Sequence, residues 1–311
     1  MKIALILDPL DSLKPAKDTS LAIMREAARR GHQLFVAEQG GLTLHSGEAV
    51  LACQEYAFAE NGGYVLGAPM AVPPAQFDAL LMRKDPPFDN EYLYSTYLLE
   101  IAENQGARVL NRPAAIRSWN EKLSVARFAQ FAPEFLVSRN IEEIRAFLAQ
   151  HGDIVVKPLD GMGGSSVFRL HQADHNIGVI LETITHYERR TVMAQRYLPQ
   201  IKDGDKRILV IDGVPVPYAL ARIPKPGETR GNLAAGGRGV AQPLSARDRE
   251  IADTVAVELK RQGLFLVGLD VIGEHLTEIN VTSPTGMVEI AAQSACDPAA
   301  LLVDALERTC R

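Results

Sequence analysis

Residues 266–286 read LVGLDVIGEHLTEINVTSPTG, and this stretch predicts a two-stranded hairpin that carries polar side chains. Apolar residues dominate positions 266–272 and 276–282, which we expect to form the two strands. Glu278 and Asn280 are two residues apart, so their side chains leave the same face of the sheet. Asp270 comes onto that face if the turn holds an odd number of residues, such as the three residues 273–275.

Asp270, Glu278 and Asn280 form a candidate metal site. Two carboxylates and an amide oxygen are hard donors, which suit Mg²⁺ that keeps some waters and shares phosphate oxygens. The alternative is the solvated polar face of a hairpin. Leu269 and Ile279, however, give the opposite face to the core, and a polar trio within an apolar region favours a bound partner.

A glycine-rich turn, DGMGGSS at residues 160–166, follows the apolar strand pattern of residues 154–158. Its glycines allow consecutive backbone N–H groups to face an anion, and Lys157 adds a positive charge beside them. The turn is neither a Walker loop nor a GxGxxG motif. Phosphate binding and a plain hairpin turn are both compatible with it.

Residues 221–239, ARIPKPGETRGNLAAGGRG, are basic and rich in glycine. Arg222, Lys225, Arg230 and Arg238 stand against Glu228, a local net charge of +3 in a protein whose formal net charge is -5. With so few large apolar residues, the segment cannot hold a packed structure alone. A disordered linker would not concentrate arginines, so we expect a mobile loop at about 226–241 that closes over an anionic ligand.

The order of strand and helix signals predicts an α/β (α+β) protein of two domains. Residues 1–121 alternate apolar strand runs with helices, which is typical of an open parallel sheet; a Pro-rich loop is expected near residue 70. Residues 122–311 contain hairpin signals, among them Asp212-Gly213, which favour antiparallel sheets; a strand is expected at 192–198. Helices are expected at residues 18–30, 90–106, 140–151, 177–190 and 245–262.

The composition excludes several classes of protein. The 33 Lys and Arg against 38 Asp and Glu argue against a general nucleic-acid binder, which would show a basic excess. The longest charge-free stretch, residues 61–77, contains prolines that prevent a membrane-spanning helix. The three cysteines lack CxxC spacing and suit reduced thiols. We therefore expect a cytoplasmic protein without nucleic-acid or membrane partners.

Taken together, the glycine-rich turn, the polar trio and the basic loop resemble those of the ATP-grasp superfamily. Within it, the amino-acid sequences of the motifs are similar to those of the bacterial glutathione synthetases. The likeness spans essentially the whole chain, and the basic loop and the last motif are very specific. The segments that carry it are 82–89 (MRKDPPFD), 157–164 (KPLDGMGG), 202–207 (KDGDKR), 228–239 (ETRGNLAAGGRG), 268–270 (GLD) and 277–286 (TEINVTSPTG).

This resemblance implies an ATP-grasp fold behind an N-terminal open parallel-sheet domain at residues 1–121. A lid subdomain would span about 122–195, and a catalytic subdomain about 196–311. The implied reaction joins γ-glutamylcysteine to glycine at the expense of ATP, giving glutathione, ADP and phosphate through an acyl phosphate. The implied cofactors are two Mg²⁺ (or Mn²⁺) ions that bind with ATP, and the implied assembly is a homotetramer.

The resemblance also implies roles for single residues. Arg207 and Arg222 would orient glycine through its carboxylate, for which a forked guanidinium is the natural partner. Catalysis would consist of positioning and charge stabilisation by Arg207, Arg222, Arg230 and Arg238, without a general base. ATP would contact Lys122, Lys157, Gly161, Gly163, Gly164, Ser165, Gln195, Tyr197, Leu198, Asp205, Arg207, Asp270, Glu278 and Asn280. The γ-glutamyl part of the substrate would contact Lys17, Arg83, Ser283, Thr285 and Glu289, and Asn280 would be a further substrate contact.

Two other functions stay open. One is a different ATP-grasp carboxylate–amine ligase, although the substrate-side motifs at 83–89 and 283–285 argue against it. The other is a non-catalytic ATP-binding regulatory module, which would have no need of both the metal trio and the arginine-rich loop.

Overall fold

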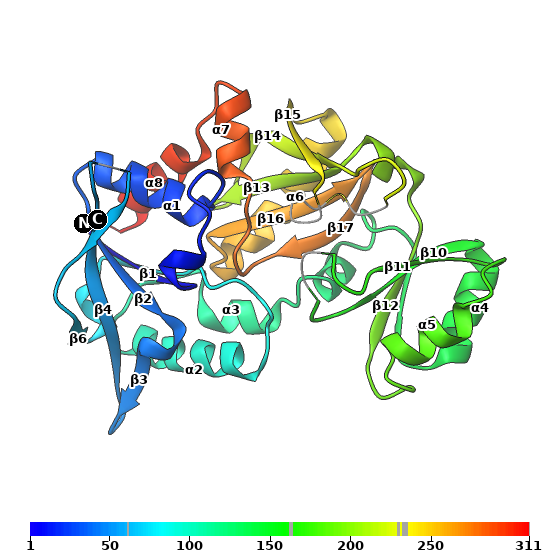
Figure 1. Cartoon of the computed structure of the whole chain (residues 1–311), viewed down its shortest axis with the longest axis horizontal. Helices are drawn as coiled ribbons and strands as arrows, with labels where there is room; N and C mark the ends of the chain where they lie inside the picture. The colour runs from blue at the N-terminus through cyan, green and yellow to red at the C-terminus, as the bar shows by residue number, and fades with distance from the viewer. Residues whose placement is uncertain (61, 162–163, 229–230, 232–235, 311) are drawn as a thin grey trace.

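Three β-sheets follow one another along the long axis of the molecule (Figure 1). The computed structural model describes residues 1–60, 62–161, 164–228, 231 and 236–310. None of the helices in this described part has the length and apolar content that crossing a membrane would require.

The first sheet has the predicted open form and a parallel centre, but it is a mixed sheet, because β4 pairs antiparallel with β2, β3, β5 and β6. Its strand order is β3-β4-β2-β1-β7-β8, and the pairs β2–β1, β1–β7 and β7–β8 are parallel. Residues 64–72, expected as a loop, instead contain two short strands that pair with β4 at an exposed edge. The strands are β1 (Lys2–Leu7), β2 (Gln33–Glu38), β3 (Leu42–His45), β4 (Glu48–Phe58), β5 (Tyr64–Leu66), β6 (Met70–Val72), β7 (Ala79–Met82) and β8 (Val109–Leu110).

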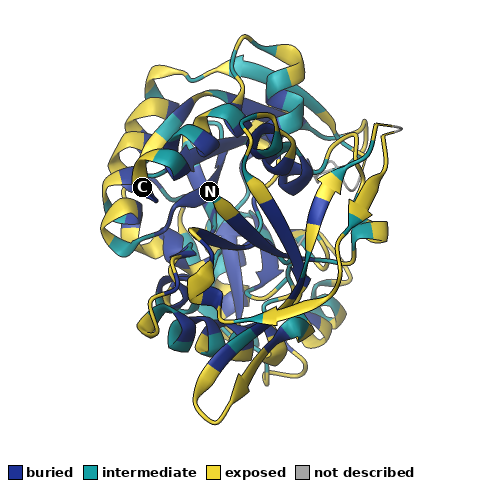
Figure 2. Ribbon diagram, turned by 90° about the vertical axis from the view of Figure 1, so that its left-hand side faces the viewer, coloured by how far each residue is buried: buried dark blue, intermediate teal, exposed yellow. Residues whose placement is uncertain are grey.

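Helices α1 (Thr19–Arg29), α2 (Asn90–Asn104) and α3 (Pro113–Ser118) cover this sheet. Asp18 caps α1 by accepting a hydrogen bond from the backbone N–H of Leu21 at 2.8 Å, as its sequence position predicts. Figure 2 shows the strands buried beneath the helices, while the hairpin of β3 and β4 projects with exposed residues.

The second sheet is antiparallel, has the order β11-β10-β12-β9 and packs with its helices around a core of its own. Helix α5 (Ile177–Ile184) ends earlier than the predicted residue 190. His186, Tyr187 and Glu188 adopt positive φ angles of 50°, 54° and 62°, a left-handed backbone that cannot continue a helix. β12 likewise ends at residue 196, not 198. The elements are β9 (Phe135–Ser138), α4 (Ile141–His151), β10 (Asp153–Pro158), β11 (Phe168–His171), α5 (Ile177–Ile184) and β12 (Val192–Arg196).

The third sheet, of order β15-β14-β13-β16-β17, occupies the middle of the molecule. Asp212 and Gly213, both at positive φ (48° and 76°), connect β13 to β14 in the predicted tight turn. Ser245 and Asp248 form a capping box at the start of α6. The elements are β13 (Asp205–Ile211), β14 (Val214–Ile223), β15 (Arg238–Pro243), α6 (Ala246–Gln262), β16 (Leu266–Ile272), β17 (His275–Asn280), α7 (Met287–Gln293) and α8 (Pro298–Thr309).

A β-bulge sets the register of β16 and β17, not the odd-numbered turn that the sequence suggested. Ile272 pairs with His275 across a two-residue turn, so a regular ladder would put Thr277 opposite Asp270. The register shifts between Asp270 and Val271, and Asp270 pairs with Glu278 instead. The bulge therefore restores the parity that brings both carboxylates onto one face of the sheet.

The N-terminal sheet and the third sheet are firmly joined. The buried amide of Asn111, just after β8, donates to the carbonyls of Leu266 and Val281 at 2.9 and 2.8 Å. Its oxygen accepts from the backbone N–H groups of Phe265 and Leu266. Helix α8 packs against α1, and their apolar side chains share one core with β1 and β13. The loops after β7 and β17 are thereby held beside each other.

Candidate active site

A cavity of about 350 Å³ lies where the three sheets meet. It is lined by the ends of β12, β13, β16 and β17, by the glycine-rich turn and by the loop after β7. Most of the predicted site residues line it: Lys122, Lys157, Gly161, Gly164, Ser165, Gln195, Tyr197, Leu198, Asp205, Arg207, Arg222, Asp270, Glu278, Asn280, Ser283 and Thr285.

Asp270 is the centre of a buried cluster of charges. Arg207, directly opposite it on β13, donates from Nε to Oδ1 at 2.5 Å and from Nη2 to Oδ2 at 3.1 Å. Arg222 on β14 approaches Oδ2 at 2.9 Å and also pairs with Asp205. A Cβ at Gly268 would lie 2.7 Å from Cδ of Arg207, so this position must be glycine for the arginine to pass.

The electrostatics keep the Asp270 carboxylate ionised. Burial alone would raise its pKa, but the guanidinium groups of Arg207 and Arg222 outweigh burial and hold the pKa below its usual range. The opposite holds for Asp205, where burial outweighs Arg222 and raises the pKa to about 6. Its Oδ1 has no hydrogen-bond partner among the described residues.

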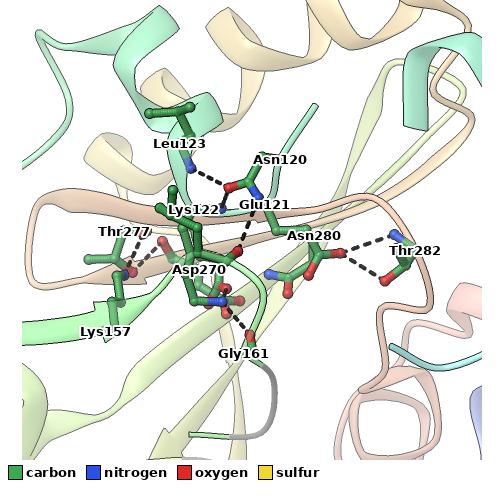
Figure 3. A network of polar contacts seen from close by, with 12 residues as sticks. Asn120, Glu121, Lys122, Leu123, Lys157, Gly161, Asp270, Thr277, Asn280 and Thr282 are labelled. Carbon is green, nitrogen blue, oxygen red and sulfur yellow. Dashed lines mark hydrogen bonds and ion pairs between the residues drawn. The ribbon is translucent and has the colours of Figure 1, made fainter. Parts of the chain in front are cut away.

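Glu278 pairs with Lys122, and Lys157 lies near enough to act on its charge. Lys122 Nζ lies 2.7 Å from Glu278 Oε1 and donates to the carbonyl of Gly161 at 2.5 Å (Figure 3). Lys157 Nζ donates to the carbonyl of Thr277 at 3.2 Å. Burial would raise the pKa of Glu278, yet the two ammonium groups lower it overall. Both lysines therefore lie at the glycine-rich turn beside an ionised carboxylate.

Asn280 completes the polar trio on this face. Its Nδ2 donates to the carbonyl of Gly268, its partner on β16, at 3.2 Å. The amide oxygen is therefore the atom that can bind a cation. Among the described residues no three His, Cys, Asp or Glu side chains gather as a metal site, and this trio consists of two carboxylates and an amide.

Gln195, Tyr197 and Leu198 line the cavity at and just beyond the end of β12. The buried Nε2 of Gln195 has no partner among the described residues. Arg169, held by Asp153, lies with its guanidinium carbon 3.7 Å from the centre of the Tyr197 ring. This wall offers an aromatic face and a free amide donor, which suit a flat heterocycle.

Four of the predicted site residues that the structure describes do not line the cavity. Lys17 is exposed before α1, and Arg238 is exposed on β15. Glu289 lies on α7, where its Oε2 is buried without a partner in the described part of the chain. Arg83 is buried and donates to Ser20 Oγ at 3.1 Å and to the Pro284 carbonyl at 2.9 Å, so it supports the loop that bears Ser283 and Thr285.

The predicted mobile loop is only partly described. Gly163 of the glycine-rich turn and Arg230 of the basic loop lie outside the described residues. Residues 238–241, predicted as loop, belong to β15, because they pair with residues 220–223 of β14. Gly231 lies at the cavity, where a Cβ would clash with the carbonyl of Arg222.

Sequence reasoning missed several residues that line the cavity, among them Asp85, Glu121, Arg169 and Thr277. Asp85 lies within the 82–89 motif but was given no role. Glu121 immediately precedes Lys122, and adjacency to a predicted phosphate ligand was the one available signal for it.

Comparison with known proteins gives consistent matches over the whole chain. Residues 1–117 match the family "Prokaryotic glutathione synthetase, N-terminal domain", and residues 121–295 match "Prokaryotic glutathione synthetase, ATP-grasp domain". A glutathione synthetase from Nitrosomonas europaea is 59% identical over 99% of this chain and 98% of its own. One from Neisseria meningitidis serogroup A is 53% identical over 98% of each chain.

Solved structures with low sequence identity share the fold. D-cycloserine synthetase DcsG has a TM-score of 0.71 at 17% identity and covers 100% of both chains. The ATP-grasp ligase PsnB, in a complex with minimal precursor, Mg and ADP, has a TM-score of 0.63 at 20% identity, covering 99% of this chain and 98% of its own. The predicted ATP-grasp fold is thereby confirmed.

Proposed function

Because this chain belongs to the prokaryotic glutathione synthetase family, and is thus an ATP-dependent ligase that forms glutathione, we propose that the cavity at the junction of the three sheets binds ATP, γ-glutamylcysteine and glycine together. One observation carries this proposal. Buried cations, paired carboxylates and the loop bearing Ser283 and Thr285 all converge on a single cavity.

On the ATP side, Lys122 and Lys157 would hold the phosphates, and the turn at 161–166 would cover them. The hydrogen bond from Lys122 to Gly161 supports this arrangement, because it joins the ammonium group to the turn itself. Gln195, Tyr197 and Leu198 would hold the adenine. The Nε2 of Gln195, which has no partner in the described part of the chain, would donate to a ring nitrogen.

Asp270, Glu278 and Asn280 would hold two Mg²⁺ (or Mn²⁺) ions that bind with ATP. The donor set fits hard cations, since both carboxylates have lowered pKa values and face one another across β16 and β17. The similar ligase PsnB is described with Mg and ADP. When bound, such ions would neutralise the charge of the transferred phosphoryl group.

On the substrate side, the γ-glutamylcysteine carboxylate would take the γ-phosphoryl group and become an acyl phosphate, which the glycine amine attacks. Arg207 and Arg222 would orient glycine through its carboxylate and stabilise charge at the reacting carbonyl. Ser283 and Thr285 would bind the γ-glutamyl group, supported by Arg83 from behind. We assign Lys17 and Glu289 to the same substrate, at the rim of the site.

The basic loop, with Arg230 and Arg238, would close over the acyl phosphate and exclude water, because an exposed acyl phosphate would hydrolyse before glycine attacked. The contact of Gly231 with the Arg222 strand supports an approach of the loop to the reacting groups. We further propose a division into residues 1–121, 122–195 and 196–311, a homotetrameric assembly, and a cytoplasmic location.

Phosphate release from ATP tests the proposal. We expect release that depends on γ-glutamylcysteine and one glutathione formed per phosphate when glycine is present. Dependence on a different carboxylate substrate would indicate another ATP-grasp ligase, and ATP binding without turnover would indicate a regulatory module. Either result would refute the assignment of the cavity.

A further inference from the structure

Glu121 has no role in the proposed reaction, and its side chain accepts hydrogen bonds from the two residues that follow β17. A single oxygen of its carboxylate, Oε1, accepts from the backbone N–H of Val281 at 3.0 Å and of Thr282 at 3.1 Å. It also accepts from the Thr282 hydroxyl at 2.8 Å (Figure 3). One side chain therefore fixes two consecutive residues that are 160 and 161 positions away in sequence.

The position of these hydrogen bonds matters. Residues 281 and 282 join the strand that bears Glu278 and Asn280 to the loop that bears Ser283 and Thr285. The backbone carbonyl of Glu121 additionally accepts from Ile279 N–H at 2.8 Å. Glu121 thus holds the chain on both sides of Asn280.

Its two sequence neighbours, Asn120 and Lys122, contact the glycine-rich turn and the residue before it. Lys122 bonds to Gly161 and Glu278, as described above. The side-chain oxygen of Asn120 accepts from the N–H groups of Lys122 and Leu123 at 3.2 and 2.9 Å, and its Nδ2 donates to the carbonyl of Leu159 at 3.0 Å. Three consecutive residues, 120–122, therefore connect the glycine-rich turn to the substrate loop.

The surroundings of the Glu121 carboxylate disfavour its ionised form. Burial and the nearby charge of Glu278 raise the pKa of Glu121 above its usual value, although the Thr282 hydroxyl and Lys122 act in the opposite direction. The carboxylate is part-buried and accepts from three donors, so its loss would leave these donors unsatisfied.

We propose that Glu121 is a positioning residue for γ-glutamylcysteine, because it fixes the course of the chain at Thr282 and so sets the places of Ser283 and Thr285. The inference rests on the proposed assignment of that loop to the γ-glutamyl group. The residues proposed to bind ATP keep other contacts when the Glu121 carboxylate is lost. Lys122 keeps its bonds to Gly161 and Glu278, and Asn280 keeps its pairing with Gly268 on β16.

Steady-state kinetics of Glu121→Ala and Glu121→Gln test the proposal. Alanine removes the acceptor, and we expect the KM for γ-glutamylcysteine to rise about 10- to 100-fold, with the KM for ATP changed less than about 3-fold. Glutamine keeps an oxygen in the same place, so Glu121→Gln should restore the KM to within about 5-fold of the parent value. A purely structural role would lower stability without this split between the two KM values.

A second pair of variants covers the case in which Glu121→Ala does not fold. Thr282→Val removes only the hydroxyl donor and keeps the two backbone hydrogen bonds and the side-chain shape. We expect a rise of about 3- to 10-fold in the KM for γ-glutamylcysteine. Thr282→Ser, which keeps the hydroxyl, should stay near the parent value.

Two further variants separate this inference from the proposed function. Glu258 lies on α6, pairs with Arg261 and does not line the cavity, so Glu258→Gln serves as the control for charge loss. Ser283→Ala tests the loop itself. An unchanged KM for Ser283→Ala beside a raised one for Glu121→Ala would support positioning and refute the assignment of Ser283. Equal rises in the KM values for ATP and γ-glutamylcysteine, or no rise in folded Glu121→Ala and Thr282→Val, would overturn the positioning role.

Discussion

Replacement of Asp270 by Asn separates the catalytic importance of this carboxylate from its structural importance. The substitution keeps the shape of the side chain but removes the charge that faces Arg207 and Arg222. Arg222 keeps Asp205 as a partner, whereas Arg207 loses the ion pair that holds its guanidinium at 2.5 Å. Because breaking a buried ion pair costs about 3–5 kcal/mol, we expect the free energy of unfolding to fall by up to that amount.

Turnover should fall by a comparable free energy. A missing ligand at the proposed cation site removes several kcal/mol of charge stabilisation from the transition state, on the order of a 10³-fold loss of kcat. Phosphate release at saturating ATP and γ-glutamylcysteine measures this loss. Chemical denaturation of the same preparation measures the change in stability.

Glu278→Gln is the matched control. Glu278 pairs with Lys122 alone among the ion pairs of the described chain, so its loss should destabilise the fold less than loss of Asp270 while reducing turnover as strongly. Near-normal turnover of either folded variant at saturating Mg²⁺ would refute the proposed metal site. Loss of activity in Asp270→Asn alone would reduce that carboxylate to an anchor for the arginines.

Three more predictions concern other parts of the chain. Arg222→Ala should raise the KM for glycine about 10- to 100-fold, because a charged hydrogen bond is lost, and should leave the KM for ATP nearly unchanged; the reverse pattern would assign Arg222 to phosphate binding. Hydrogen bonds from Arg29 and Arg30 lower the pKa of Glu26 from 4.5 to about 2. A group with a lowered pKa stabilises the fold above its unfolded pKa, so acid denaturation should show a contribution of at most ~1 kcal/mol that is lost between pH 4.5 and 2 and is absent in Glu26→Gln. Shortening the loop at 227–239 should raise the ratio of phosphate released to glutathione formed above one, and a ratio of one at full rate would refute its proposed protective role.

Local sequence rules predicted much of the fold because the signals act over a few residues. Ser245 with Asp248, and Asp212-Gly213, specify a helix start and a tight turn whose geometry depends on neighbouring atoms only. Helix α5 was overextended because no Gly or Pro marks its end. The left-handed residues from His186 to Glu188 end it through backbone angles that their side chains do not announce.

In the candidate site too, features set by local spacing were predicted and features without a local signal were not. The two-residue spacing of Glu278 and Asn280 correctly predicted that they share a face of the sheet. The prediction that Asp270 lies on the same face is also correct, but the three-residue turn on which it was based is absent. A bulge at Thr277 supplies the parity, and nothing in an alternating strand pattern distinguishes it from a regular ladder. Polar residues on a strand therefore predict a shared face more reliably than the register that produces it.

The pairing of charged side chains in the site could not be predicted from the sequence, because the partners are far apart in the chain. Arg207 and Asp270 are opposite one another on neighbouring strands but 63 residues apart in the chain, and Glu121 meets Thr282 at a separation of 161. A buried charge requires a partner of opposite charge, so the sequence predicts that such a partner exists. It does not predict which residue of the chain provides that charge. The fold supplies the position, because Asn111 joins the N-terminal sheet to β16 and so places residue 121 against the end of β17. A residue such as Glu121 consequently becomes recognisable as part of the site only when the two sheets are seen together.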